Sequence, residues 1–301
     1  MSTRTTPTAT TAQPPAGTWT MGDLEVTRFG YGAMQLAGPW VMGPPADHDG
    51  AVAVLCEAVE LGITHVDTSD AYGPHVTNQV IREALHPYAG EHVAAKVGAT
   101  RDVQGGWPPA RRPEDLRRAV HDNLDALGLD VLDLVNLHLG DAQGPQPASL
   151  AEAFETLLEL QQQGLVRHLG VSDATRDQVA EARALGTIVC VQNLYNLAHR
   201  DDDALVDELA ADGVAYVPFF PLGGFTPMQS SALSGVAERR GATPMAVALA
   251  WLLQRSPSVL LIPGTSSVAH LRENVAGAGL VLDGDDLVAL DRIGRAEGAE
   301  A

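Results

Sequence analysis

Short apolar runs alternate with segments of helical period along most of this chain, and that alternation limits the possible folds more than any other feature. The runs are continuously apolar, which is typical of parallel strands covered on both faces. Eight such units in one domain predict an α/β fold, a single (β/α)8 TIM barrel. The expected strands are 28–32, 63–67, 92–97, 132–138, 166–171, 187–192, 214–219 and 259–262.

Helices are expected between these strands, with boundaries set by their end residues. Gly62 and Gly164 are placed as helix stops, and Pro113 followed by two acidic residues is typical of a first turn. The expected helices are 50–62, 77–86, 113–128, 149–163, 174–184, 201–211, 243–255, one from about 267, and 284–294. An open doubly wound sheet is the alternative, but no Gly-x-Gly-x-x-Gly turn follows the first strand.

The N-terminal segment has a different composition from the rest. Residues 1–20 are rich in Thr, Pro and Ala, show no periodicity and lack the apolar core of a secretory signal, so a disordered tail is predicted. The barrel domain is assigned to residues 21–301. It is expected to open with a short exposed hairpin or strand that carries Leu24 and Val26.

The charge balance restricts the partners of the chain. The net charge is −19, which argues against nucleic acid and against an anionic membrane surface, because both require a basic face. No apolar run approaches the roughly 20 residues of a membrane span. Cys56 and Cys190 lie in apolar segments and are expected to be core thiols, so a cytoplasmic location is predicted. The protein is expected to be a monomer or a small homo-oligomer.

Three neighbouring predicted strands end in titratable residues, Asp67, Lys96 and His138, and Tyr72 follows the first of them. Lys96 is the only lysine in the chain. Because barrel enzymes place their chemistry at the C-terminal ends of strands, these residues are expected to meet. A buried Asp67–Lys96 ion pair beside Tyr72 would favour the phenolate and lower the tyrosine pKa from its usual value of about 10. With His138 as a hydrogen-bond donor, the group suits protonation of a carbonyl oxygen during reduction.

These motifs resemble those of the aldo-keto reductases, (β/α)8 barrels that reduce aldehydes and ketones with a nicotinamide cofactor and without a metal. The resemblance covers about residues 21–296 and rests on VDTSDAYG, AAKVG and LVNLH. It implies that Tyr72 is the general acid, that Lys96 tunes it and that Asp67 holds Lys96. It further implies that His138 orients the carbonyl while the cofactor supplies the hydride.

The same resemblance implies a cofactor site. Ser172, Asp173 and Gln192 would hold the nicotinamide amide, although the family has Asn where Asp173 stands, and Phe219 would stack on the ring. The turn at 262–267 and the helix after it would grip the adenosine and its 2′-phosphate. Gly264 and His270 stand where the family often has lysine and arginine, and Arg272 is either a replacement charge or a solvated helix residue. NADPH is therefore expected, with NADH left open. The expected cofactor residues are Gly32, Ala33, Met34, Ser172, Asp173, Gln192, Phe219, Pro221, Leu222, Gly223, Gly264, Thr265, Ser266, His270, Arg272, Glu273 and Asn274.

The loops after the strands are expected to select the substrate. They carry Trp40, Trp107 and Phe220, which favour an aromatic or apolar-faced carbonyl compound, although loop tryptophans also serve as lids. The segments GYGAMQLAGP and AYGPHVTNQVIREAL resemble a bacterial branch of the family, some of whose members reduce pyridoxal. Two alternatives stay open: a non-catalytic NADPH-binding sensor subunit, and a barrel lyase that uses Lys96 as a Schiff-base amine.

Overall fold

The computed structural model describes residues 16–141, 144–221, 223 and 230–293. Seven parallel strands form one curved sheet. In their order across the sheet they are β11 (Ala215–Tyr216), β10 (Cys190–Gln192), β9 (Val166–Ser172), β6 (Leu132–His138), β5 (His92–Val97), β4 (His65–Asp67) and β3 (Tyr31–Gly32).

Residues 258–261 join the two edges of this sheet. On one side the Leu260 N–H donates to the Tyr216 carbonyl at 2.9 Å, and on the other the Gly30 N–H donates to the Leu261 carbonyl at 2.7 Å. Both contacts are parallel bridges. This segment is the eighth strand, at the predicted position, so the sheet closes into a (β/α)8 barrel.

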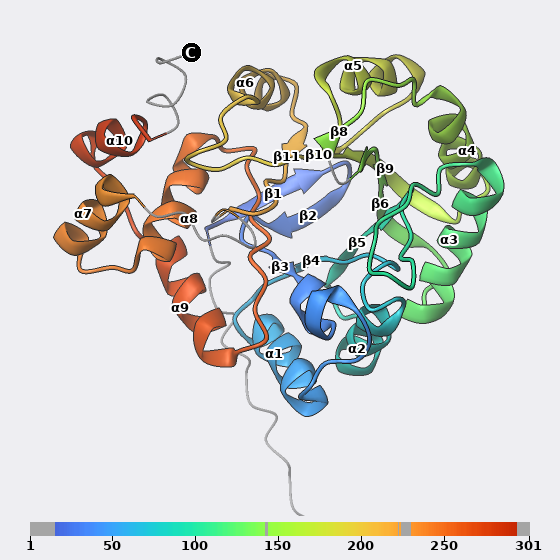
Figure 1. Ribbon diagram of the computed structural model, residues 1–301, viewed down its shortest axis with the longest axis horizontal. Helices are drawn as coiled ribbons and strands as arrows, with labels where there is room; N and C mark the ends of the chain where they lie inside the picture. Colours follow the sequence, from blue (N-terminus) through green and yellow to red (C-terminus); the bar gives the residue numbers. More distant parts are fainter. Residues whose placement is uncertain (1–15, 142–143, 222, 224–229, 294–301) are drawn as a thin grey trace, which may run out of the picture.

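Helices surround the barrel (Figure 1). They are α1 (His48–Glu60), α2 (Val76–Leu85), α3 (Pro113–Leu127), α4 (Ala151–Gln162), α5 (Arg176–Leu185), α6 (Asp203–Ala211), α7 (Ser231–Arg240), α8 (Pro244–Arg255), α9 (Val268–Ala278) and α10 (Gly284–Leu290). Helix α7 was not predicted, because its sequence SALSGVAERR carries a weak apolar pattern; Ser230 caps it by accepting from the Leu233 N–H. Among the described helices, none combines the length and apolar composition that a membrane span requires.

Shorter elements lie in the loops at the C-terminal ends of the strands. The 3-10 helices η1 (Ala33–Leu36) and η2 (Pro39–Val41) follow β3, and the two-residue strands β7 (Gly140–Asp141) and β8 (Gly144–Pro145) follow β6. Helix α2 begins at Val76, one residue before the predicted start.

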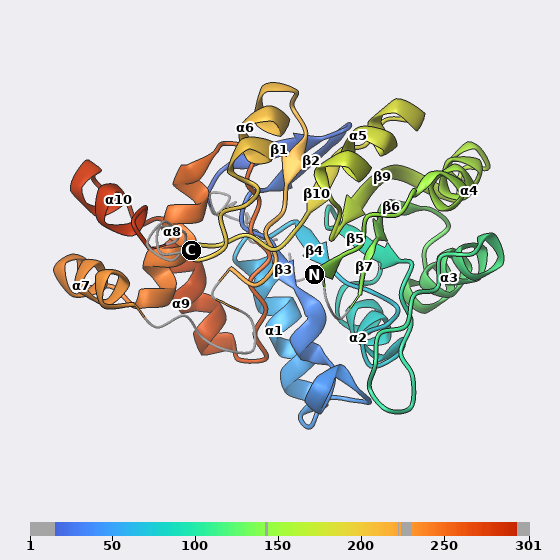
Figure 2. The same cartoon turned by 45° about the horizontal axis from the view of Figure 1, so that its top comes forward.

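An antiparallel hairpin, β1 (Thr18–Met21) and β2 (Leu24–Thr27), crosses the N-terminal end of the barrel (Figures 1 and 2). Asp23 in its turn accepts hydrogen bonds at 2.6 Å from Arg167 and His168, at the start of β9. The predicted tail boundary at residue 20 is wrong, since β1 begins at Thr18; residues 1–15 lie outside the described residues. The predicted exposure of the hairpin is also wrong, because Met21, Leu24 and Val26 are buried against the barrel interior.

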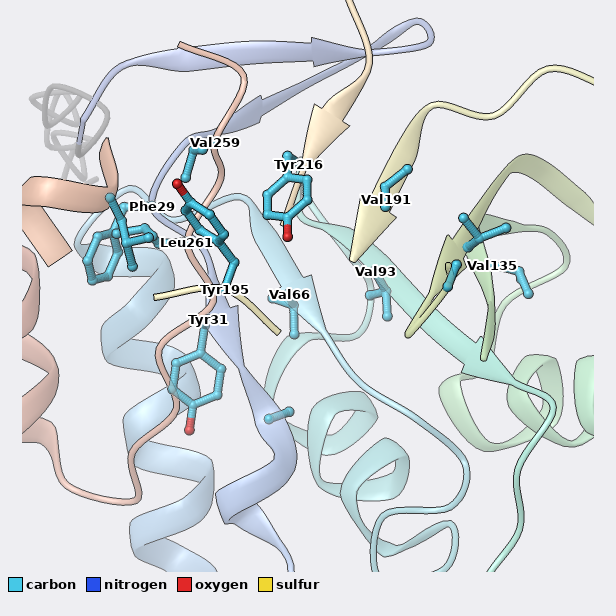
Figure 3. Packing of buried hydrophobic residues seen from close by; sticks show 14 of the residues in the cluster. Phe29, Tyr31, Val66, Val93, Val135, Val191, Tyr195, Tyr216, Val259 and Leu261 are labelled. Atoms are coloured by element: carbon cyan, nitrogen blue, oxygen red, sulfur yellow. The ribbon is translucent and has the colours of Figure 1, made fainter. Parts of the chain in front are cut away.

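On several strands, neighbouring residues contribute to two different cores, as the two-residue period of a strand requires. Val93 and Val135 point outward and pack among the helices (Figure 3), whereas Ala94 and Leu134 point into the barrel. The interior of the barrel is therefore packed with side chains, and the hairpin closes its N-terminal end. This leaves the C-terminal end as the place for a functional site. Cys190 belongs to the interior as predicted; Cys56 does not, because its face of α1 is exposed.

Candidate active site

Asp67 and Lys96 meet at the C-terminal ends of the adjacent strands β4 and β5. The Lys96 Nζ atom lies 2.5 Å from Asp67 Oδ1 and also donates to the Thr68 carbonyl at 3.3 Å. Their side chains are only 11% and 4% exposed. Burial lowers the lysine pKa, but the charges and hydrogen bonds of Asp67 and Tyr72 outweigh it, so the pKa of Lys96 is raised. Lys96 is a buried ammonium held by a carboxylate.

Tyr72 lies in the turn that follows β4, where its N–H donates to the Ser69 carbonyl at 3.1 Å. Lys96 Nζ lies 5.4 Å from the centre of the Tyr72 ring. The tyrosine is buried, and burial raises its pKa more than Lys96 lowers it. The structure therefore differs from the expected net lowering of this pKa, and Tyr72 is a neutral phenol that can donate a proton.

A second buried acid, Asp70, lies in the same turn and was not singled out in the sequence. Burial raises the pKa of Asp70 to about 7. Its charge is one of the influences that raise the Tyr72 pKa. The only feature of the sequence that could have identified Asp70 is its position between Asp67 and Tyr72.

His138 ends β6 and faces Ser172 at the end of β9. Its Nδ1 atom lies 3.3 Å from Ser172 Oγ. Burial, followed by the charges of Lys96 and Arg111, lowers the pKa of His138 to about 4, so the imidazole is neutral at neutral pH. In the tautomer in which the Ser172 hydroxyl donates to Nδ1, the imidazole proton is on Nε2, where it is available to an incoming oxygen.

Gln192 reaches across the mouth of the barrel from β10 to β4. Its Nε2 atom donates to Asp67 Oδ2 at 2.9 Å, and the amide must have this orientation because a carboxylate only accepts. Both oxygens of Asp67 are therefore held. Gln192 Oε1 is buried and has no hydrogen-bond partner among the described residues. An unpaired acceptor at this position fits the amide N–H of a nicotinamide.

Asp173 follows β9 with a positive φ of 52° and packs against Gly140, where an added Cβ would come within 1.5 Å of its carboxylate. Burial, reinforced by Asp141, raises the pKa of Asp173 to about 6, and Arg111 opposes this shift. Arg111 donates to the carbonyls of His138, at 3.1 Å, and Gly140, at 2.7 Å. Arg111 thus places a positive charge beside the C-terminal end of β6. No pattern in the sequence around Arg111 indicates this role.

The ends of the first and eighth strands pass very close to each other. A Cβ atom on Gly32 would lie 2.3 Å from the Ile262 carbonyl, and one on Gly264 would lie 2.6 Å from the Gly32 carbonyl. Tyr31 fixes the following turn by donating to the Thr265 carbonyl at 2.6 Å. Glycine at Gly32 and Gly264 is therefore required by the packing of the backbone, whatever the turn binds.

Helix α9 starts directly after this turn. Ser267 caps it by accepting from the His270 N–H, and His270 and Glu273 are exposed while Asn274 is buried. Arg272 donates to both carboxylate oxygens of Glu57 on α1, at 2.7 and 2.9 Å. The Arg272 side chain is exposed, and its charge is paired with Glu57, a contact that neither the replacement charge nor the solvated helix residue anticipated.

The aromatic loop residues separate into two groups. Trp107 packs edge-on against Tyr72, with ring centres 6.1 Å apart. Phe219 and Phe220 pack edge-on against each other at 5.4 Å on the opposite loop. The Trp40 side chain is 83% exposed. The remaining predicted cofactor residues lie in three loops: Ala33 and Met34 in η1, Pro221, Gly223 and Leu222 after β11, with Leu222 outside the described residues, and the exposed Ser266 in the turn before α9.

A family comparison agrees with this arrangement. The model of the aldo/keto reductase family matches residues 28–295, nearly the whole barrel. The chain belongs to the aldo/keto reductase family. Among its relatives, pyridoxine 4-dehydrogenase of Escherichia coli (strain K12) is 61% identical over 283 residues, which cover 93% of this chain and 99% of the relative.

Solved aldo-keto reductases have the same fold. A thermostable aldo-keto reductase in complex with the inhibitor epalrestat matches with a TM-score of 0.78 and 28% identity, over 92% of this chain and 99% of that one. An aldo-keto reductase of Klebsiella pneumoniae in complex with NADPH matches with a TM-score of 0.75 and 26% identity, over 91% and 93%. This aldo-keto reductase is therefore an oxidoreductase that acts on carbonyl compounds.

Proposed function

We propose that this protein is an NADPH-dependent reductase that converts pyridoxal, or a similar aromatic aldehyde, to its alcohol, with Tyr72 as general acid. The observation that carries the proposal is the buried pair of Lys96 and Asp67, 2.5 Å apart, beneath the ring of Tyr72. An ammonium fixed beside a phenol favours transfer of the phenolic proton at the moment when negative charge develops on a substrate oxygen.

Each residue of the group has a separate task in this proposal. Tyr72 gives its proton to the carbonyl oxygen, and the Lys96 ammonium stabilises the phenolate that remains. The neutral imidazole of His138 donates from Nε2 to the same oxygen and orients it. Asp67, held at both oxygens by Lys96 and Gln192, keeps the ammonium in position. A nicotinamide cofactor, when bound, would supply a hydride to the carbonyl carbon, and with the proton from Tyr72 this gives the alcohol.

The residues proposed for the cofactor lie at two places on the barrel rim. Gln192 Oε1, Ser172 and Asp173 would hold the nicotinamide amide. The turn before α9 and the exposed His270 would meet the 2′-phosphate, because helix N-terminal N–H groups favour an anion. The Klebsiella pneumoniae reductase bound to NADPH supports this choice of cofactor.

The substrate proposal rests on the relative and on the aromatic wall. The 61% identical relative is named pyridoxine 4-dehydrogenase, and pyridoxine is the alcohol that reduction of pyridoxal produces. Trp107 beside Tyr72 offers an apolar surface next to the reacting oxygen. The alternative of a Schiff-base lyase is not favoured, since the raised pKa of Lys96 keeps its nitrogen protonated. The two free thiols support the proposed cytoplasmic location.

Initial rates of cofactor oxidation test the proposal. The wild-type protein is assayed with NADPH and with NADH against pyridoxal, 4-nitrobenzaldehyde and propanal, and in reverse with pyridoxine and NADP+. We expect turnover of pyridoxal with NADPH preferred. NADPH binding without turnover of any aldehyde would support the sensor alternative and contradict the proposal, and turnover of propanal alone would contradict the aromatic substrate.

A further inference from the structure

The loop after β5 is an ordered arm that carries Trp107. Its two sides are joined by hydrogen bonds from the Thr100 N–H to the Pro108 carbonyl, at 3.0 Å, and from the Ala110 N–H to the Gly98 carbonyl, at 2.9 Å. Asp102 closes its tip by accepting from two backbone N–H groups, at 2.9 and 2.7 Å. Trp107 is therefore presented by a defined hairpin-like loop.

Arg101 on this arm stacks on the indole of Trp107. Its guanidinium carbon lies 3.9 Å from the centre of the Trp107 ring. The same indole contacts Tyr72, and the planes of these two rings make an angle of 84°. Arginine suits this contact because its guanidinium is flat and can stack on an aromatic face while its N–H groups bond elsewhere. The three side chains form a continuous row of contacts, with Arg101 over the face of Trp107 and Tyr72 edge-on to it, and the row ends at the proposed general acid.

The N–H groups of Arg101 hold the loop that follows β3. One donates to the Trp40 carbonyl at 2.6 Å, and another contacts the Met42 sulfur at 3.3 Å. Trp40 and Val41 both have φ of 61°, a conformation that costs energy for residues other than glycine. The Val41 carbonyl in turn accepts from the Gly73 N–H at 3.2 Å, directly after Tyr72.

We propose that Arg101 is a positioning residue of the substrate site: it fixes the plane of the Trp107 indole beside Tyr72 and so builds a wall that selects flat aromatic aldehydes over aliphatic ones. The inference rests on the proposed role of Tyr72. Arg101 joins two loops and one aromatic ring around that residue, and the mechanism itself uses none of its atoms.

The test compares the variants Arg101→Met and Arg101→Lys with Arg118→Met, an exposed arginine on α3 whose bonds stay within its own helix. Benzaldehyde and cyclohexanecarbaldehyde serve as aldehydes of similar size that differ in flatness. For both Arg101 variants we expect KM for benzaldehyde to rise about tenfold with kcat within about twofold, while KM for the cyclohexane compound changes little. The control should match the wild type, and lysine should not rescue, since it cannot stack and fork as arginine does.

A binding measurement keeps the inference testable without turnover. Calorimetric titration of benzyl alcohol and cyclohexylmethanol into the NADPH-loaded protein, where no hydride can be transferred, should show the same selective loss of the aromatic ligand. If the Arg101 variants selectively lose the aromatic ligand while the wild-type protein reduces no aldehyde, the proposed function fails and the role of Arg101 in binding stands. Equal weakening of both ligands, or no change in the Arg101 variants, would overturn the inference.

Discussion

The Tyr72 hydroxyl is subject to two opposing influences at the residue scale. Burial disfavours the charged phenolate, and the Lys96 ammonium favours it. Burial is the larger of the two, so the pKa lies above the ordinary value of 10.0 and the phenol stays protonated at neutral pH. That state suits the proposed role of Tyr72 as general acid, which requires it to give up a proton during reduction. The rate of reduction should therefore not decline through Tyr72 ionisation until the pH exceeds about 10.

Replacing Tyr72 by phenylalanine removes the hydroxyl of the proposed general acid and little else. We expect Tyr72→Phe to lower kcat for pyridoxal reduction by at least about 100-fold, because a positioned general acid contributes factors of that order. The dissociation constant of NADPH, measured by quenching of tryptophan fluorescence, should stay within about threefold of wild type. Substantial turnover by this variant would show that another group is the acid.

Asp173 is a carboxyl whose burial makes protonation easier. Its folded-state pKa of about 6 lies above the ordinary 3.8, so the folded protein binds that proton more tightly than the unfolded chain. The stability that the folded protein gains from binding this proton is fully present below the ordinary pKa. It is lost as the pH rises through about 6.

The variant Asp173→Asn should be more stable than wild type at neutral pH. After allowance for solvent screening we expect a gain of about 1 kcal/mol at about pH 7.5 and almost none at about pH 4. Asparagine tolerates the positive φ, so the backbone need not change. Urea unfolding at both pH values measures the effect. A gain of equal size at both would mean that ionisation is not its cause.

At the scale of elements, the β1–β2 hairpin acts as the floor of the barrel. Leu24 is 2% exposed and packs among inward-facing side chains of the strands. We expect Leu24→Ala to lower the free energy of unfolding by about 2 to 5 kcal/mol, the range for truncating a buried leucine. KM should stay unchanged, because the site is at the other end of the barrel. The exposed neighbour Glu25 supplies the control, and Glu25→Ala should shift stability by less than about 0.5 kcal/mol.

The start of α9 is the element proposed to meet the 2′-phosphate. Arg272 is paired with Glu57, which leaves exposed His270 as the residue whose replacement can add a free charge there. We expect His270→Arg to tighten NADPH binding about three- to tenfold and NADH binding much less, since only NADPH carries the extra phosphate. His270→Gln controls for the loss of the imidazole. Equal tightening of both cofactors would place the phosphate elsewhere.

At the scale of the whole molecule, the net charge of −19 dominates the long-range electrostatics. Self-repulsion of that size opposes the compact state, and salt screens it. The surface also carries ion pairs such as Arg117–Glu159, which salt weakens, but exposed pairs contribute only about 0 to 1 kcal/mol each. We expect Tm to rise by a few degrees between about 10 and about 300 mM NaCl. A fall in Tm would show that the ion pairs outweigh the repulsion.

The fold could be predicted because its information is local. Eight buried runs separated by amphipathic helices specify a closed parallel barrel, and parallel strands place their C-terminal ends together. That geometry was enough to expect Asp67, Lys96 and His138 at one rim, where the structure brings Asp67 and Lys96 into contact. Helix α7 escaped prediction because its apolar spacing is weak, and the hairpin was expected to be exposed because its sequence does not show that the barrel has an open end to cover.

The tertiary structure alone decided which side chains touch across the barrel. Gln192 reaches Asp67 over 125 residues of chain, and Arg101 reaches the Trp40 carbonyl from another loop. Such contacts depend on the curvature of the closed sheet and on loop conformations that no local pattern encodes. The balance of burial against the nearby ammonium, which sets the direction of the Tyr72 pKa, is decided there too. Periodicity along the sequence determined the strands and the residues at their ends. Three-dimensional packing determined which of these side chains meet and in which direction their pKa values shift.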